Sequence, residues 1–219
     1  GHAGEEVLSQ CMERYGGFNH NIQTLRVVTS IENKYYKFYG LNLTIETLDG
    51  LIKHNGPVKN LAPYKKILRR DLFSNKIVFS TFPSLEAQVA AISDDIAYNN
   101  HDLEDGLRAG LFTIKKVSSI PYISELINKH FKNIKNFRRE IIISQIVRDL
   151  INSMVVDVIN TTNKNLKKSS PQSINDIYKQ DCLIVDFSDK MKKIDKQIKY
   201  FLKRNMYNHK KVVVNTNKG

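Results

Sequence analysis

This chain has 219 residues, of which 41% are hydrophobic and 26% are charged, with 34 Lys and Arg against 22 Asp and Glu. Such a composition builds an ordinary hydrophobic core and excludes a disordered chain, a collagen-like chain and a scaffold held by disulfides. The unbroken apolar runs are far shorter than the roughly 20 residues that span a bilayer, so we expect no membrane partner.

Helical periodicity dominates the first half of the sequence. Apolar residues recur at helical spacing over residues 5–15, 18–37 and 44–55, and a glycine follows closely after each segment. Residues 58–80 show no steady period, which predicts a connecting segment with a short helix near residues 64–70.

The second half continues the helical pattern. A long helix is predicted from its N-cap, Ser84, to Gly106, and further helices are predicted over residues 124–130, 137–161 and 189–208. There is no internal repeat and no alternation of strands with helices. The sequence therefore predicts an all-α fold.

The two cysteines indicate the compartment. Cys11 and Cys182 lie far apart and match no metal-ligand spacing, which fits a reducing environment. We therefore expect two small buried thiols and a cytoplasmic protein. No charged and then apolar segment precedes the first helix, so the sequence gives no support for export.

The positive charge is concentrated in the second half. Residues 111–219 hold 22 Lys and Arg against 9 Asp and Glu. A basic half favours polyanionic partners such as nucleic acid or nucleotides. A compositional bias toward Lys, Asn and Ile produces the same excess, and a solvated basic surface is the interpretation that we favour.

A possible acid/base pair stands at the start of the chain. On a helix, His2 and Glu5 are three residues apart and share one face, where a carboxylate can fix the tautomer of an imidazole and raise its basicity. Taken alone, a terminal His beside a Glu is more often a solvated first turn.

The long helix carries a polar face. Asp94, Tyr98 and Asp102 are spaced four and four, so carboxylate, phenol and carboxylate lie in successive turns. We expect some acids of this helix to line an interior cleft, where one Asp could bind a hard divalent cation and Tyr98 could contact substrate. An exposed acidic face is an equally good interpretation of the spacing.

Two further groups are weaker signals. His20 follows a double glycine in the first turn of a predicted helix, where it could donate to phosphate or lie solvated beside an N-cap at Asn19. Lys53 and His54 stand at a helix C-terminus, where a cation suits the helix dipole without any ligand.

Five motifs occur in order: Gly1-His2-Ala3-Gly4-Glu5, Phe18-Asn19-His20-Asn21, Gly40-Leu41-Asn42-Leu43-Thr44, Lys53-His54-Asn55-Gly56-Pro57, and Ser84 to Gly110. Together they resemble the bacterial deoxyguanosinetriphosphate triphosphohydrolase-like proteins (the dGTPase family) of the HD-domain phosphohydrolase superfamily. The resemblance is dense over residues 1–110 and thinner afterwards.

The resemblance implies a fold and an activity. The fold is an HD-domain helical bundle, with its core over residues 1–162 and a basic helical region over 163–219. The activity is hydrolysis of a deoxynucleoside triphosphate (dGTP or another dNTP) to a deoxynucleoside and triphosphate, with a divalent metal ion such as Mg²⁺ or Mn²⁺. Relatives assemble, which implies a homo-oligomer.

The resemblance also implies roles for individual residues. His2 matches the catalytic histidine and Glu5 its carboxylate partner, while His20 lines the phosphate site and belongs to the same catalytic set. Asp94 matches a metal ligand. The substrate contacts implied in the same way are Lys53 to phosphate and Tyr98 and Asp102 to the sugar.

Other parts of the family pattern are absent from these residues. By the resemblance, a first metal-binding His and a His-Asp pair lie before Gly1, and a C-terminal extension follows Gly219. We therefore expect the chain to be a fragment, inactive alone, and assign the activity to the parent protein. The competing hypothesis is a non-catalytic protein that binds nucleotides or single-stranded nucleic acid, which the basic half and the absent ligands favour.

Overall fold

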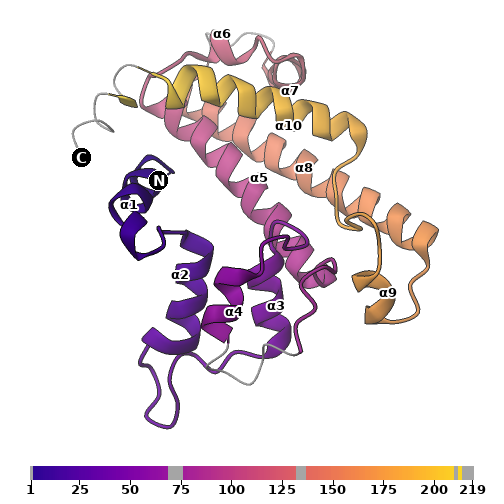
Figure 1. The fold of residues 1–219 in the computed structure, drawn as a ribbon. Coiled ribbons are helices and arrows are strands. Elements are labelled where there is room, and N and C mark those ends of the chain that lie inside the picture. The colour runs from indigo at the N-terminus through magenta and orange to yellow at the C-terminus, as the bar shows by residue number, and fades with distance from the viewer. Residues whose placement is uncertain (1, 69–75, 132–136, 210–211, 214–219) are drawn as a thin grey trace. The chain divides into compact units, whose positions relative to one another are not determined.

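The computed structural model of the chain describes residues 2–68, 76–131, 137–209 and 212–213 (Figure 1). Within the helices, the side chains of residues 2, 3, 65 and 66 are not described. The described residues form helices and no strand, which confirms the predicted all-α fold.

The α-helices are α1 His2–Cys11, α2 His20–Arg26, α3 Ile45–Lys53, α4 Ala62–Leu68, α5 Leu85–Arg108, α6 Ile114–Val117, α7 Pro121–His130, α8 Arg139–Ser169, α9 Ile174–Tyr178 and α10 Asp189–Leu202. A 3₁₀ turn covers Glu13–Tyr15, and π-helical segments cover Val27–Ile31 and Lys203–Tyr207. None of the described helices is both long enough and apolar enough to cross a membrane.

The chain divides into two compact units. The first unit comprises residues 1–91 and 171–184, and the second comprises residues 92–170 and 185–219. The domain boundary expected after residue 162 falls inside α8, and that domain division stays a prediction.

The core of the first unit is built by α2, α3 and the segment before α5. Its buried members are Leu25, Leu48, Ile52, Ile77 and Phe79. The helices of this core begin at side-chain caps, because the oxygens of Asn19 and Thr44 accept hydrogen bonds from backbone N–H groups three residues ahead.

The predicted helix over residues 18–37 is shorter than expected. Helical structure ends at Ile31, because the chain turns back at Gly40 and the Leu41 N–H donates to the Val28 carbonyl at 2.8 Å. Gly40 has a φ of +69°, and a Cβ there would lie 2.4 Å from the Thr29 carbonyl carbon. Only glycine fits this close approach.

The core of the second unit lies between α5, α7, α8 and α10. Side chains that are at most 1% exposed include Leu103, Leu107, Ile123, Ile142, Leu150, Met154, Ile198 and Leu202. Gly106 does not end α5 as predicted. A Cβ there would lie 2.3 Å from the ring of Phe112, so this glycine permits close packing while the helix continues to Arg108.

The prediction that the cysteines are buried is wrong. Cys11 and Cys182 are both exposed. Cys11 lies on α1, where every described side chain is at least partly exposed, including Val7 at 59%. The apolar spacing of α1 therefore does not mark a buried stripe in these residues.

Candidate functional site

The structure brings Glu5 of α1 and His20 of α2 together. The ring Nδ1 of His20 lies 2.7 Å from Oε1 and 2.9 Å from Oε2 of Glu5, and the His20 backbone N–H donates to Oε1 at 3.0 Å. A carboxylate that accepts from Nδ1–H fixes the tautomer in which Nε2 is the acceptor of the neutral ring. Both members of this pair were predicted as catalytic residues, although not as partners of each other.

Local structure explains how the pair forms. Gly16 and Gly17 have φ values of +98° and +76°, which turn the chain back after α1. The Phe18 N–H then donates to Ser9 Oγ at 3.3 Å, and Asn19 caps α2 through the N–H of Ile22. The cap sets the first turn of α2, which places His20 beside Glu5.

The predicted pairing of Glu5 with His2 stays a prediction, because the His2 side chain lies outside the described residues. His20 is 58% exposed and Glu5 is 26% exposed at their side chains, so a solvent-borne ligand can reach the imidazole. A cavity of about 370 Å³, which Ser9 and Asn19 help to line, opens in the same unit.

Lys53 lies in the core of the first unit, at 1% exposure. Its ammonium is 2.6 Å from Asp49 Oδ1, donates to Thr81 Oγ1 at 2.7 Å and sits 5.5 Å from the ring centre of Tyr178. Burial raises the pKa of Asp49, and the adjacent Lys53 offsets this only in part. A phosphate contact at Lys53 would have to replace these partners, and that role stays a prediction.

The predicted polar face of α5 belongs to the second unit. Asp94 is exposed, Tyr98 is 52% exposed, and Asp102 is half-buried. In the part of the chain that the structure describes, no group of three or more His, Cys, Asp or Glu side chains is arranged to hold a metal ion. Asp94 therefore offers a single carboxylate ligand within these residues, and its metal-binding role stays a prediction.

Tyr207 joins this face and was not found from the sequence. Its hydroxyl donates a short hydrogen bond to Asp102 Oδ2. Burial, followed by the hydrogen bonds with Asp102 and Tyr98, raises the pKa of Tyr207 far above its usual range. No sequence signal marks Tyr207, because it stands 105 residues from Asp102.

We expect Tyr207 to remain un-ionised at pH values where ordinary tyrosines form phenolate. Tyr207→Phe should therefore leave unchanged the number of tyrosines that ionise up to about pH 11, as measured by ultraviolet phenolate absorbance. A phenol with a raised folded-state pKa contributes stability that is present below about pH 10 and is lost as the pH rises through the folded-state value. Loss of one ionising tyrosine in the variant would contradict this assignment.

Comparison with known proteins gives a consistent set of relatives. No family model matches the chain. A deoxyguanosinetriphosphate triphosphohydrolase-like protein of Pelagibacter ubique is 50% identical over all 219 residues, which cover 59% of that relative. Proteins of the same name from Parvibaculum lavamentivorans and Bartonella tribocorum are 40% and 42% identical, over 97% and 99% of this chain and 54% and 55% of their own lengths.

The chain thus spans between a half and three fifths of the length of these curated relatives. The alignment with the Pelagibacter ubique protein extends over every residue of the chain, including both compact units. The chain belongs to the family of deoxyguanosinetriphosphate triphosphohydrolase-like proteins.

Proposed function

We propose that the protein containing this chain hydrolyses a deoxynucleoside triphosphate, dGTP or another dNTP, to a deoxynucleoside and inorganic triphosphate. The relatives' shared name supports this substrate class. The observation that supports this chemistry is the contact between Glu5 and His20, because an imidazole oriented by a carboxylate can act as a general acid or base.

The reaction needs a water molecule directed at the α-phosphorus and a proton delivered to the departing nucleoside oxygen. With Nδ1 held by Glu5, His20 can exchange a proton only through Nε2, at the solvent-accessible side chain. The Glu5 carboxylate stabilises the imidazolium that forms when Nε2 takes a proton. A divalent ion, when bound, supplies positive charge for the triphosphate.

The remaining roles are part of the same proposal. His2 acts beside the Glu5–His20 pair, and Asp94 contributes one ligand to a divalent metal ion such as Mg²⁺ or Mn²⁺. Tyr98 and Asp102 contact the sugar, with Tyr207 holding the Asp102 carboxylate in place. We also propose a homo-oligomer, to be measured by light scattering.

The first test is triphosphate release from each of the four dNTPs with Mn²⁺ or Mg²⁺. We expect release by the longest natural form of the protein, at a rate that a chelator abolishes. The full-length Pelagibacter ubique relative serves as the comparison, assayed in parallel with the 219-residue chain. Absence of release from the longest form, under conditions in which the relative is active, would contradict the proposal.

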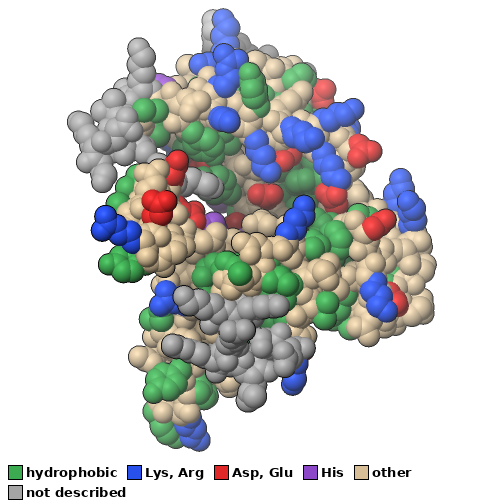
Figure 2. All heavy atoms as spheres, in the orientation of Figure 1, with side chains coloured by type: hydrophobic (Ala, Val, Ile, Leu, Met, Phe, Trp, Pro, Cys, Tyr) green, Lys and Arg blue, Asp and Glu red, His purple; other side chains and the backbone are tan. Residues whose placement is uncertain are grey.

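A second candidate is a non-catalytic protein that binds single-stranded nucleic acid, favoured by the excess of 22 basic over 9 acidic residues after residue 110. Figure 2 shows Lys and Arg side chains dispersed among Asp and Glu over the viewed face. That dispersal favours a solvated surface over a basic groove. Strongly salt-dependent binding of single-stranded DNA, without nucleotide turnover, would favour the second candidate.

A further inference from the structure

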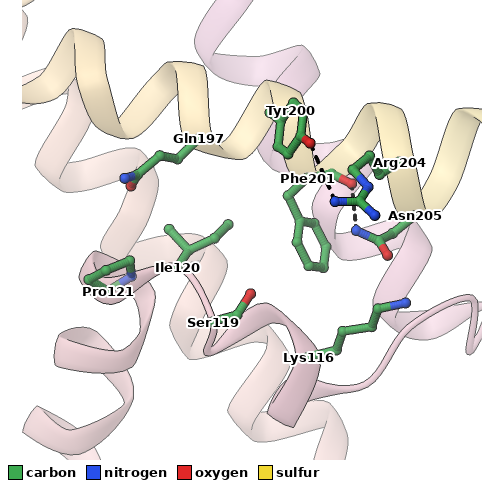
Figure 3. A pocket seen from close by; sticks show the side chains of 9 residues that line it. All are labelled: Lys116, Ser119, Ile120, Pro121, Gln197, Tyr200, Phe201, Arg204 and Asn205. Atoms are coloured by element: carbon green, nitrogen blue, oxygen red, sulfur yellow. Dashed lines mark hydrogen bonds between the residues drawn. The ribbon is translucent and has the colours of Figure 1, made fainter.

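A pocket of about 400 Å³ lies in the second unit between α6, α7 and α10 (Figure 3). Its volume falls in the range of small-molecule sites. It contains none of the residues assigned above to hydrolysis. The pocket therefore needs an explanation of its own.

The floor of the pocket is apolar and fixed. Ile120 and Phe201 are 4% and 6% exposed, and the Phe201 ring packs edge-on against Phe112 with ring centres 4.9 Å apart. The side-chain amide of Asn205 donates to the Phe201 carbonyl at 2.8 Å. Because these contacts hold the floor in place, the pocket is formed before any ligand arrives.

The rim carries two cations. Lys116 and Arg204 lie at the same end of the pocket, with Asn205 between them (Figure 3). Among the described residues, neither cation has a carboxylate within the 4.0 Å salt-bridge distance, whereas Lys192 and Lys199 of α10 are both paired with aspartates. Two uncompensated cations at one end of a cavity create a positive potential there.

Local geometry directs Arg204 toward the pocket. Its Nη1 donates to the Tyr200 hydroxyl at 3.3 Å, and its guanidinium carbon lies 5.7 Å from the centre of the Tyr200 ring. Arg204 belongs to the π-helical segment Lys203–Tyr207, which re-aims side chains relative to a continuing α-helix. The guanidinium is therefore preorganised by its aromatic neighbour.

The start of α7 adds to the positive potential. Ile120 is the N-cap of this helix and Pro121 its first residue, and both line the pocket. The N-cap forms no side-chain hydrogen bond to the first turn. The positive end of the α7 dipole thus lies at the same cavity as the two cations.

We propose that this pocket binds a small phosphorylated molecule, with its phosphate groups between Lys116 and Arg204 and the rest of the ligand on the apolar floor. Arginine and lysine bind phosphate by charge-assisted hydrogen bonds, which suits a rim on which none of the described lining residues is a carboxylate. The lining of the pocket includes none of the residues proposed for hydrolysis, and the contacts proposed here require no metal ion.

The test is calorimetric titration of the 219-residue chain with inorganic triphosphate in the presence of a chelator. We expect saturable binding at one site. Arg204→Gln and Lys116→Gln should each weaken it by about tenfold or more, the usual effect of removing one charge-assisted hydrogen bond. Both side chains are exposed, so unfolding transitions of the variants should match the parent chain and confirm that they fold.

Two matched variants separate this site from other effects. Lys168→Gln removes an exposed cation near the end of α8, outside the pocket, and should leave the affinity unchanged. His20→Ala should also leave it unchanged. A second titration with a non-hydrolysable dNTP analogue identifies the ligand source: tighter binding than triphosphate indicates a nucleotide, and equal binding indicates the phosphate groups alone.

Three results would overturn the proposal: no saturable binding of either probe, equal weakening by Lys168→Gln, or binding of a single-stranded oligonucleotide with no binding of triphosphate. The outcome is independent of the proposed hydrolysis. Turnover by the longest natural form, without metal-free binding to the chain, would contradict the pocket alone. Arg204-dependent binding to the chain, without turnover by the longest natural form, would contradict the hydrolysis alone.

Discussion

In the longest natural form of the protein, His20→Ala should reduce kcat for dNTP hydrolysis by about 10²–10⁴-fold, the contribution of a positioned acid/base group. The reason is geometric, because Glu5 holds the imidazole through Nδ1 at 2.7 Å and commits Nε2 to proton transfer. The free energy of unfolding should change little, since the His20 side chain is 58% exposed. Steady-state triphosphate release and thermal unfolding measure the two quantities separately.

The matched control is His101→Ala. The His101 side chain is 65% exposed and its Nδ1 lies 3.8 Å from Glu104, so it is also an exposed histidine next to a carboxylate. We expect no large change in kcat there. If His20→Ala turned over dNTPs as fast as the parent protein, the proposed role of His20 would have to be abandoned.

Glu5→Gln refines the assignment. It keeps an acceptor for Nδ1–H but removes the charge that stabilises the imidazolium, so kcat should fall by less than in His20→Ala. If Glu5 acts through His20, adding Glu5→Gln to His20→Ala should cause little further loss. A large further loss would show that Glu5 serves another group, for which His2 is the candidate.

Lys53→Met should be the most destabilising of these substitutions. It leaves the Asp49 carboxylate in the core without its cation, and breaking a buried ion pair in this way costs about 3–5 kcal/mol. Asp49 Oδ2 is already buried without a hydrogen bond from the described residues, so no donor stands ready to compensate. Urea unfolding followed by circular dichroism measures the loss.

The control for charge alone is Lys34→Met. The ammonium of Lys34 lies 3.9 Å from Glu32 and its side chain is 67% exposed, so about 0–1 kcal/mol is expected. The double variant Lys53→Met with Asp49→Leu should recover much of the stability, because it removes both buried charges. If Lys53→Met lost no more stability than Lys34→Met, the stabilising role of the buried Lys53–Asp49 pair would be contradicted.

The stability that Lys53→Met loses should also depend on pH. The pKa of Asp49 is raised by burial, so its contribution to stability is present below about pH 3.8 and is lost as the pH rises through the folded-state value. Lys53→Met removes the hydrogen bond and the charge that lower this pKa, so it should rise further. The difference in stability between variant and parent should therefore shrink as the pH falls.

Local signals located the longer helices, whereas the short helices α6 and α9 and the contacts between helices were not predicted. Asn19 was recognisable as a helix cap because a cap depends only on the next three residues, and the helix predicted from residue 44 begins at a cap of the same kind, Thr44. The partner of Glu5 could not be predicted in that way. Helical spacing suggests His2, whereas the observed contact to His20 depends on the turn at Gly16 and Gly17.

Burial was the other limit. At a helix C-terminus, Lys53 is explained adequately by the helix dipole, and nothing nearby in sequence indicates that Thr81 and Tyr178 enclose it. The contact between Tyr207 and Asp102 joins positions 105 residues apart. Hydrophobic periodicity predicts only which residues share a face over a few helical turns. Contacts between residues far apart in sequence are therefore found only in the folded structure.

The close approach at Gly40 limits which sequence changes the loop of residues 32–39 can accept. The hydrogen bond from the Leu41 N–H to the Val28 carbonyl closes the base of this loop. The tip of the loop is solvated, and Tyr36 there is 94% exposed. Doubling the length of a flexible closed loop costs only about 0.6 kcal/mol, so insertions at the tip are cheap. Any side chain at position 40 would collide with the Thr29 backbone. The loop therefore tolerates insertions at its tip but no substitution of the glycine at its base.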